Sequence, residues 1–138
     1  MEEALREALE RLLTLKGECT FQIFNDLDAG QITMTQLNYL KYVDQMHETT
    51  ISELSESLNL SKPTVTESIK KLQKCDLVHK RQCQTDGRKY YIELTDKGEQ
   101  LAHMEQLSVM RLAEKITLVL DEEAVQKLIE ALEGLKKK

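Results

Sequence analysis

Residues that interrupt helices are scarce in this sequence of 138 residues, which contains one proline and five glycines. Aromatic residues make up only 4% of the chain, and tryptophan is missing. No stretch is rich in serine and glycine, so we expect no flexible linker between domains. With apolar residues at 41%, we expect a core of leucine, isoleucine and valine at helical spacing, which is typical of a single, mainly helical domain.

Long apolar runs are also missing from the sequence. None approaches the roughly 18 residues that a membrane-spanning helix needs. The opening segment MEEALREALE is acidic and amphipathic, unlike the basic and then apolar pattern of a secretory signal. We therefore expect a cytoplasmic protein with no membrane segment.

Motifs for covalent chemistry are equally scarce. Cys19, Cys75 and Cys83 are odd in number and widely spaced, and they form no CxxC pair. This disfavours both a disulfide framework and structural zinc. The sequence has no glycine-rich phosphate loop, no HExxH motif and no nucleophile elbow. We expect neither an enzyme nor a protein that binds a cofactor or a metal.

The charge, in contrast, has an informative distribution. The chain is acidic overall, with a net charge of −5, yet residues 61–89 contain eight lysines and arginines against three carboxylates. A cationic face on an acidic body is typical of proteins that bind the phosphates of nucleic acid. Ordinary solvated charge is the plainer alternative.

Hydrophobic periodicity and capping residues predict about six helices. Apolar residues near a 3.6-residue period indicate a long first helix over residues 1–25, and DLDAGQ at residues 26–31 interrupts it. Short polar side chains that can cap helix starts then precede each later apolar stripe. They are Thr33, Thr50, Ser61, Thr95 and Asp121. The second and third helices are expected to end near His47 and at Asn59, and the helix after Thr95 is expected to run toward Leu118.

The predicted helix after Ser61 has two different faces. Val65, Ile69 and Leu72 form a buried stripe, and Pro63 fits the first turn because amides there have no partner within the helix. The opposite face is polar. It contains Lys62, Thr64, Thr66, Glu67, Lys70, Lys71 and Lys74.

A period of two then predicts a β-hairpin. Its strands are expected at residues 77–84 and 89–94, joined by a type I′ turn in which Asp86 and Gly87 take positive φ. The turn itself does not require Arg88 and Lys89 at its tip. Two short helices with a tight connection, followed by a cationic hairpin, describe a helix-turn-helix with a wing. A helix fits the major groove of DNA, where small hydroxyl side chains reach base edges and cations reach phosphates.

Three segments resemble the multiple-antibiotic-resistance-regulator (MarR) family of winged-helix transcription factors. They are ITMTQLNYLKYV, TTISELSESLNLSKPTVTESIKKLQKCDLV and DGRKYYIELTDKGEQL, which together span residues 32–101. The resemblance implies a homodimer with a winged-helix core at residues 30–98 and a dimerisation region formed by residues 1–29 and 99–138. It also implies that the helix over residues 62–74 enters the major groove and that Arg88 enters the minor groove, oriented by Asp86.

Two departures from the family pattern are visible. The family has glycine where Cys75 and Asp76 end the recognition helix, so a residue with a side chain must accept the turn at some cost in strain. Glu67 stands where many members carry a basic residue. Its carboxylate repels phosphate but can accept a hydrogen bond from a cytosine amino group, so Glu67 either shapes specificity or faces away.

Three kinds of signal are considered for such a regulator. Cys19 matches the region where some relatives carry a peroxide-sensing thiol, although a packed cysteine is the favoured interpretation. Three separate histidines, His47, His79 and His103, give weak support to metal sensing. A small amphiphile could also lodge between the dimer helices and the winged domain. Its expected lining is Phe21, Phe24, Met46 and Met104.

The sequence thus predicts a regulator that binds a pseudo-palindromic operator in double-stranded DNA as a homodimer and acts as a repressor released by a small-molecule effector. The predicted DNA contacts are Ser61, Lys62, Thr64, Thr66, Glu67, Lys70, Lys71, Lys74, Asp86, Arg88 and Lys89. A thiol- or metal-responsive regulator of the same fold is one alternative. A winged-helix module that binds a protein partner and no DNA is another.

Overall fold

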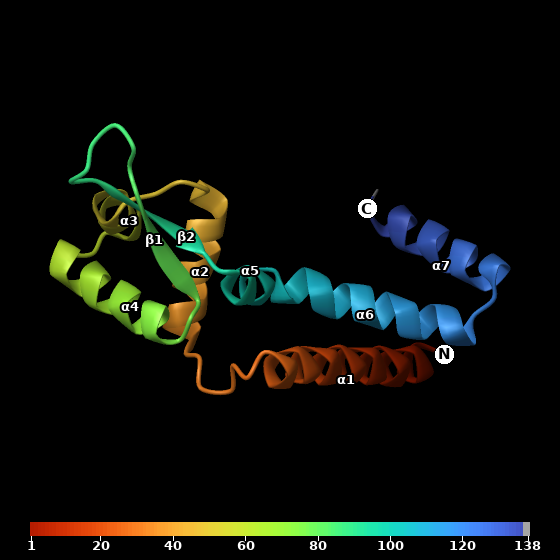
Figure 1. The fold of residues 1–138 in the computed structure, drawn as a ribbon. Helices are drawn as coiled ribbons and strands as arrows, with labels where there is room; N and C mark the ends of the chain where they lie inside the picture. The colour runs from red at the N-terminus through yellow and green to blue at the C-terminus, as the bar shows by residue number, and fades with distance from the viewer. Residues whose placement is uncertain (137–138) are drawn as a thin grey trace. The chain divides into compact units, whose positions relative to one another are not determined.

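The computed structural model describes residues 1–136 and has helices α1 to α7 and strands β1 and β2. The chain divides into two compact units, one formed by residues 24–105 and the other by residues 1–23 with 106–138. Figure 1 shows the elements in chain order. They are α1 (Glu2–Asp26), α2 (Met34–Met46), α3 (Ile51–Leu58), α4 (Lys62–Lys74), β1 (Val78–Gln82), β2 (Tyr90–Leu94), α5 (Asp96–Ala102), α6 (Met104–Val119) and α7 (Glu122–Leu135). The predicted mainly helical fold with a small hairpin is confirmed.

The unit of residues 24–105 has a closed apolar core. Helices α2, α3, α4 and α5 and the hairpin each contribute completely buried side chains to it. These include Leu40, Leu54, Val65, Ile69, Leu72, Ile92 and Leu101. The core therefore fixes α4 and the hairpin on one scaffold.

The predicted caps begin the helices as expected. Thr33 and Gln36 form a reciprocal capping box at α2, and Thr50 and Ser61 accept hydrogen bonds from the amides of Glu53 and Thr64 at the starts of α3 and α4. Each such bond pairs an amide that lacks a partner within the helix. Helix α3 ends at Asn59, whose left-handed backbone (φ 56°, ψ 45°) is the conformation that the sequence indicated.

Asp76 accepts the turn where the family has glycine. Its φ is 59°, and its amide donates to the carbonyl of Gln73 at 3.0 Å while the amide of Leu77 donates to that of Leu72 at 3.0 Å. This pair of bonds is a Schellman motif, which normally favours glycine at the left-handed position. The predicted strain at residues 75–76 therefore falls on Asp76.

Thr95 and Gly98 fasten α5 to that same corner. The Thr95 hydroxyl donates to the carbonyl of Asp76 at 2.7 Å and accepts from the amide of Gly98 at 3.1 Å. A Cβ atom on Gly98 would lie 2.0 Å from the Leu77 carbonyl oxygen. This close backbone approach explains why the Leu-Thr-x-x-Gly segment requires glycine at its end.

The hairpin is joined to the helix-turn-helix at its far edge. Strands β1 and β2 pair antiparallel with Arg81 opposite Tyr91. On the other edge of β2, the Ile92 amide donates to the carbonyl of Thr49 at 2.7 Å. Thr49 is completely buried and lies in the connection between α2 and α3. The base of the wing is thus tied directly to this connection.

The helix predicted to run on from Thr95 is divided in two. Helix α5 ends at His103 (φ −100°, ψ 16°), and α6 begins at Met104, so residues 1–136 contain seven helices where about six were expected. His103 is held by Asp44 of α2, with Nε2 and Oδ2 2.8 Å apart. Helical periodicity continues on both sides of the break, so the sequence pattern does not reveal it.

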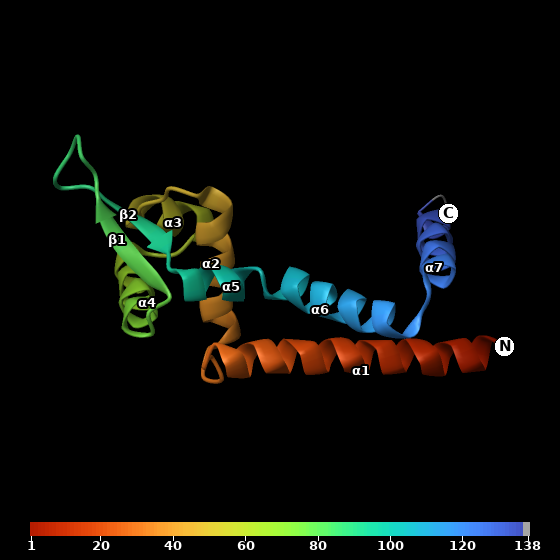
Figure 2. The ribbon, with the colours of Figure 1, turned by 45° about the vertical axis from the view of Figure 1, so that its right-hand side comes forward.

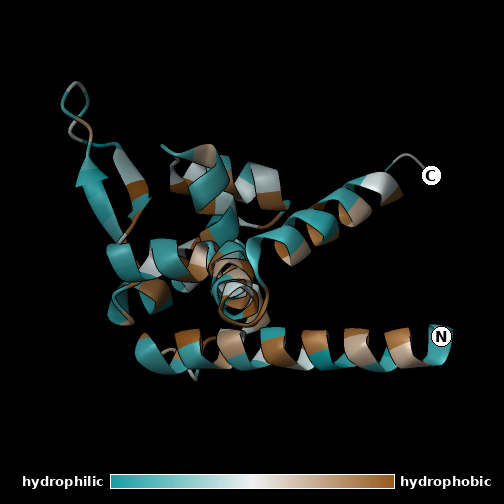
Figure 3. Cartoon of the chain, turned by 90° about the vertical axis from the view of Figure 1, so that its right-hand side faces the viewer, coloured by the Kyte–Doolittle hydropathy of each residue, from teal (hydrophilic) through white to brown (hydrophobic). Residues whose placement is uncertain are grey.

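The unit of residues 1–23 and 106–138 is less completely closed. Figures 1 and 2 show α1 and α6 running side by side, and the hydroxyls of Thr20 and Ser108 lie 2.8 Å apart. Cys19, Ile23 and Leu112 are buried, but α7 buries none of its described residues. Figure 3 shows apolar residues recurring along α1 and α7. Large exposed ones are Leu5, Leu9, Leu13, Leu128, Ile129, Leu132 and Leu135.

None of the described helices has the length and hydropathy that a bilayer crossing requires.

Candidate nucleic-acid interface

Helix α4 presents a polar face to solvent, as its sequence predicts. Val65, Ile69 and Leu72 are completely buried and hold the helix on the core. The predicted contact residues of the opposite face are exposed, except for Thr66, which is half-buried. The exposed ones are Ser61, Lys62, Thr64, Glu67, Lys70, Lys71 and Lys74. The structure thus brings hydroxyl and ammonium groups together on one side of a fixed helix.

The hydroxyls at the start of α4 are partly committed to the cap. Ser61 Oγ accepts from the Thr64 amide at 3.3 Å and lies 2.8 Å from Thr64 Oγ1. A hydroxyl can donate one bond and accept two, so each of these retains capacity for a further partner. The first turn of the helix therefore presents ordered groups in place of freely rotating ones.

Glu67 lies on the solvent face of α4. Across the part of the chain that the structure describes, its carboxylate makes no ion pair. Glu67 shares this exposed face with the lysines. Both interpretations, that it shapes specificity or that it faces away from DNA, stay predictions.

The expected type I′ turn at Asp86 and Gly87 is wrong. No glycine among the described residues has positive φ, and neither does Asp86. Strand pairing continues to the Cys83 amide, which donates to the Lys89 carbonyl at 2.8 Å, and a tighter turn follows in which the Lys89 amide donates to the Asp86 carbonyl at 3.0 Å. Gly87 and Arg88 are the central residues of that turn. The loop is longer than a two-residue hairpin, so no positive φ is needed.

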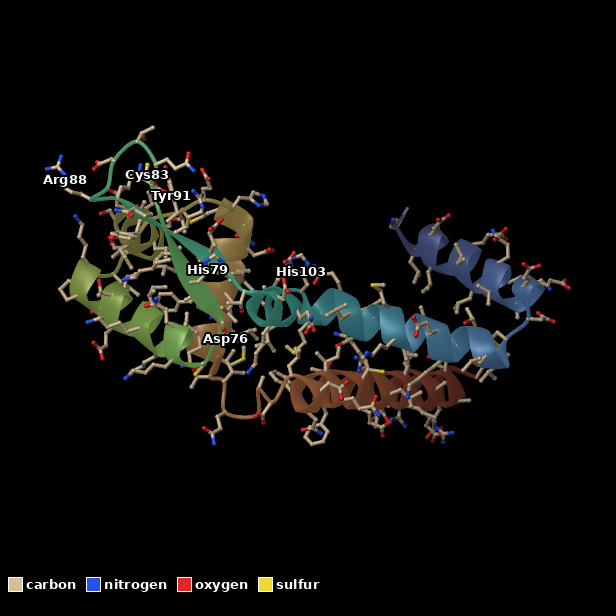
Figure 4. The ribbon with its side chains drawn as sticks, in the orientation of Figure 1. Asp76, His79, Cys83, Arg88, Tyr91 and His103 are labelled. Atoms are coloured by element: carbon tan, nitrogen blue, oxygen red, sulfur yellow. The ribbon has the colours of Figure 1, made fainter. Side chains whose placement is uncertain are left out.

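Asp86 organises this turn through its side chain. Its Oδ1 accepts from the Arg88 amide at 3.0 Å, which is the bond of an Asx-turn. The same oxygen lies 3.6 Å from Arg88 Nε, so the two side chains form a loose ion pair. The Arg88 side chain is 95% exposed, and Figure 4 shows it projecting outward from the wing. Asp86 therefore fixes the backbone at Arg88 and leaves the guanidinium accessible.

A shallow groove lies between the wing and the start of α3. Its lining includes Lys80, Arg88 and Lys89 from the hairpin and Thr50 and Ser52 from the α3 start. Sequence reasoning did not single out Lys80 or Ser52 as contact residues. The register supplies the missing signal for Lys80, because its partner across the hairpin is the buried Ile92 and both side chains lie on the face toward α3.

Cys83 in the wing has a perturbed thiol that sequence reasoning also missed. A hydrogen bond from the Thr85 side chain, helped by the backbone amides of Thr85 and Asp86, lowers the pKa of Cys83 to about 7. The Sγ and Oγ1 atoms lie 3.2 Å apart. Cys19, the candidate redox residue, is completely buried. Packing is therefore the role that the surroundings of Cys19 favour.

The other candidate sensing residues differ in burial. Met104 is buried, Phe24 and Met46 are half-buried, and Phe21 is 65% exposed. An effector pocket lined by these four residues stays a prediction. Within residues 1–136, no three histidine, cysteine or carboxylate side chains gather in a way that could hold a metal ion.

The buried faces of α3 and α4 and the hairpin that follows them define a winged helix-turn-helix. Comparison with known proteins finds the same fold in a family of regulators. Residues 32–90 match the sequence model of the MarR family. No curated protein sequence matches the chain. The match covers the winged helix and confirms the resemblance to this family over those residues.

Solved structures extend the likeness over nearly the whole chain. The transcriptional regulator Tm0710 from Thermotoga maritima is 26% identical, with a TM-score of 0.61, and the match covers 99% of this chain and 94% of that one. MepR from S. aureus, solved with DNA, is 20% identical (TM-score 0.62; 98% and 97% covered). FabT from Streptococcus pneumoniae, also solved with DNA, is 19% identical (TM-score 0.56; 99% and 96% covered). The likeness to MepR and FabT is one of fold.

Proposed function

We propose that this protein is a sequence-specific DNA-binding transcriptional regulator that reads the major groove with α4 and the minor groove with the wing. One observation carries the proposal: α4 has a sealed apolar face and a cationic, hydroxyl-bearing face beside a wing tipped by an exposed arginine. A helix of this kind fits the major groove, and its cations lie where phosphates pass. The solved structures of MepR and FabT, which are complexes with DNA, support the same role.

The side chains of α4 suit two kinds of DNA contact, one with base edges and one with phosphates. Thr64 and Thr66 have short hydroxyl side chains that suit base edges, whereas Lys70, Lys71 and Lys74 suit phosphates. Glu67 shares this exposed face. In the groove, its carboxylate would accept from a cytosine amino group and would repel an approaching phosphate, so we propose that Glu67 contributes to base selection.

The wing supplies a second contact of a different kind. Arg88 is almost fully exposed on a turn whose backbone is fixed by Asp86. A guanidinium on such a support enters the narrow minor groove of A·T-rich DNA, where the negative potential is strongest. Lys80 and Lys89 line the groove between the wing and α3. We propose that these lysines contact the DNA backbone next to the wing.

We further propose that two copies of the chain form the active regulator. Leucines on α1 and α7 are exposed, Leu132 by 56% and Leu135 by 67%. An apolar surface of this kind marks an association site, and a second copy would cover it symmetrically. Each copy supplies one α4, so the dimer would bind a pseudo-palindromic operator with half-sites about 34 Å apart.

The finer parts of the proposal rest on the family resemblance. They are repression as the mode of action, release by a small-molecule effector, and a cytoplasmic location. A repressor without an effector would bind its operator equally well in the presence of any small amphiphile. Comparing operator affinity with and without candidate amphiphiles therefore tests this part separately.

Fluorescence anisotropy with the duplex upstream of the protein's own gene tests the main proposal. We expect Arg88→Ala to weaken binding by about 1 to 3 kcal/mol, with nearly unchanged thermal stability, because the side chain makes little contact with the fold. Lys71→Ala should weaken all sequences alike and lower the salt slope by about one unit. An unrelated duplex of equal length is the control.

Two results would contradict the proposal. Equal affinity of the parent and Arg88→Ala at ~150 mM salt would reduce the wing to a structural hairpin. Absence of any salt-dependent binding to duplex DNA would favour the alternative, a winged-helix module that binds a protein partner.

A further inference from the structure

Arg81 in the wing differs from the other cations of the surface because it is hydrogen-bonded to two carboxylates. Its Nε donates to Glu93 Oε1 at 2.9 Å, and its Nη2 donates to Glu48 Oε1 at 2.5 Å. The guanidinium also lies 4.9 Å from the centre of the Tyr91 ring. The hydrogen bond to Glu93, followed by the one to Glu48, raises the pKa of Arg81 above its ordinary value. Arg81 therefore stays positively charged and remains paired with the carboxylates of Glu48 and Glu93.

These partners belong to three different segments. Arg81 lies on β1, Tyr91 and Glu93 lie on β2, and Glu48 lies in the connection between α2 and α3. The segments are neighbours in space, because β2 pairs with β1 on one edge and with Thr49 on the other. The Arg81 side chain thus crosses β2 to reach Glu48. It links the outer strand of the wing to the helix-turn-helix.

The Tyr91 ring connects this link to the tip of the wing. Lys89 Nζ lies 5.2 Å from the centre of the same ring that Arg81 approaches. Lys89 directly follows Arg88 in the chain, and its amide closes the turn that carries Arg88. A change in the position of the Tyr91 ring would therefore shift Lys89 and with it the turn that carries Arg88.

We propose that Arg81 is a positioning residue, which sets the wing against the helix-turn-helix so that Arg88 meets DNA in the register fixed by α4. The proposal rests on the proposed DNA-binding function. It assigns to Arg81 no contact with DNA, because its guanidinium lies against Glu48, Glu93 and the Tyr91 ring. The neighbouring cation that does line the groove between the wing and α3 is the preceding residue, Lys80.

The geometry requires arginine and not simply a positive charge. A planar guanidinium can donate along two directions and lie on a ring at the same time, whereas a lysine ammonium is a single point charge on a flexible stem. We therefore expect Arg81→Lys to restore only part of what Arg81→Ala loses. Glu48→Gln, which keeps the shape but removes the charge, should have a smaller effect of the same kind.

A double-mutant cycle with Arg88 tests the proposal on the full-length protein. Arg81→Ala should weaken specific binding by about five- to tenfold, whereas in the Arg88→Ala background the same change should weaken it by less than about twofold. Lys80→Ala is the matched control, because it removes a neighbouring cation that lacks this link. Its effect should be equal in both backgrounds.

Additive effects of Arg81→Ala and Arg88→Ala would overturn the proposal. Additivity is also what simple electrostatics predicts, since the freed carboxylates of Glu48 and Glu93 would repel phosphate whether or not Arg88 is present. The cycle therefore separates positioning from loss of charge.

Hydrogen exchange of the Ile92 amide in the free protein gives a readout that does not depend on DNA. This amide bonds to Thr49, so its exchange reports the junction that Arg81 spans. Exchange should be several-fold faster in Arg81→Ala, intermediate in Arg81→Lys and unchanged in Lys80→Ala. Unchanged exchange in folded Arg81→Ala would overturn the proposal. If the parent bound no duplex DNA, the proposed function would fail, and the exchange rates would still decide whether Arg81 holds the wing.

Discussion

The two units of the chain differ in how completely they bury their apolar side chains. Residues 24–105 enclose Leu40, Leu54 and Ile69 completely, whereas α7 buries none of its described residues and Leu128 and Leu132 remain 39% and 56% exposed. The first unit carries the candidate interface on a core whose apolar side chains are already buried. The second has an apolar surface that its own residues do not cover. The comparison supports the proposal that different parts of the chain read DNA and bind a second copy.

The largest expected effect comes from removing the apolar surface. Replacing Leu128 and Leu132 together by Asp should abolish the dimer and yield monomer or aggregate, because two buried leucines contribute about 4 kcal/mol, on the order of a thousandfold in affinity. Sedimentation velocity measures this directly. Gln126→Asp, which adds charge on the same helix at a polar position, should leave the dimer intact. If the parent protein were a stable monomer, the apolar surface would not be a dimer interface, and the proposed binding to two half-sites would be wrong.

The closed unit can be disturbed at its tightest backbone contact. Gly98→Ala should destabilise the protein by about 3 kcal/mol, because the new Cβ would lie 2.0 Å from the Leu77 oxygen. Thermal or urea unfolding measures the loss. Gly134→Ala is the matched control in the other unit, where an added Cβ meets nothing within 4 Å. There the change should stabilise α7 by up to about 1 kcal/mol, and equal losses at both positions would contradict the difference between the units.

The thiols of the two units should react differently. Because the pKa of Cys83 is lowered to about 7, its thiolate fraction rises as pH increases through 7. At pH 7 we expect iodoacetamide to label Cys83 on the order of fivefold faster than an unperturbed thiol, after allowing for the lower nucleophilicity of a weaker base. Thr85→Val should slow the labelling by removing the first hydrogen bond. Cys19 should stay unlabelled in the folded protein, and rapid labelling of Cys19 would show that its unit opens readily.

The smallest expected effect concerns the strained turn after α4. Asp76→Gly should stabilise the closed unit by about 0.5 to 1 kcal/mol, since glycine accepts positive φ at no steric cost and the gain is reduced by its freer unfolded state. Cys75→Gly is the control, because the φ of Cys75 is −87° and needs no glycine. That variant should be slightly destabilised. Chemical denaturation resolves both changes.

The sequence was most informative where one local rule decides the structure. The Thr33, Thr50 and Ser61 caps, the left-handed Asn59 and the two faces of α4 all follow from short-range chemistry. The turn at Asp86 was predicted incorrectly because the Asp-Gly pair suits a two-residue loop, whereas the pairing of Cys83 with Lys89 lengthens the loop and moves the turn. The break at His103 coincides with a contact to Asp44, which is far away in the sequence.

The candidate site shows the same division. Exposure of the α4 lysines follows from helical spacing, and Arg88 stood out because the turn does not require it. The Arg81 link was not predictable, since Glu48 and Glu93 come together only when the connection between α2 and α3 pairs with β2. The thiol of Cys83 was overlooked because its surroundings are set by the fold of the loop and not by a motif.

The uncovered leucines of α1 and α7 also bear on how the regulator would respond to its own abundance. Where a second copy completes the fold, the melting temperature rises with protein concentration by mass action. At low abundance, the concentration of the dimer, which carries two α4 helices, would rise with the square of the monomer concentration. A modest change in expression would then produce a disproportionate change in operator occupancy, so the steepness of the genetic response would originate in a helix that buries nothing by itself.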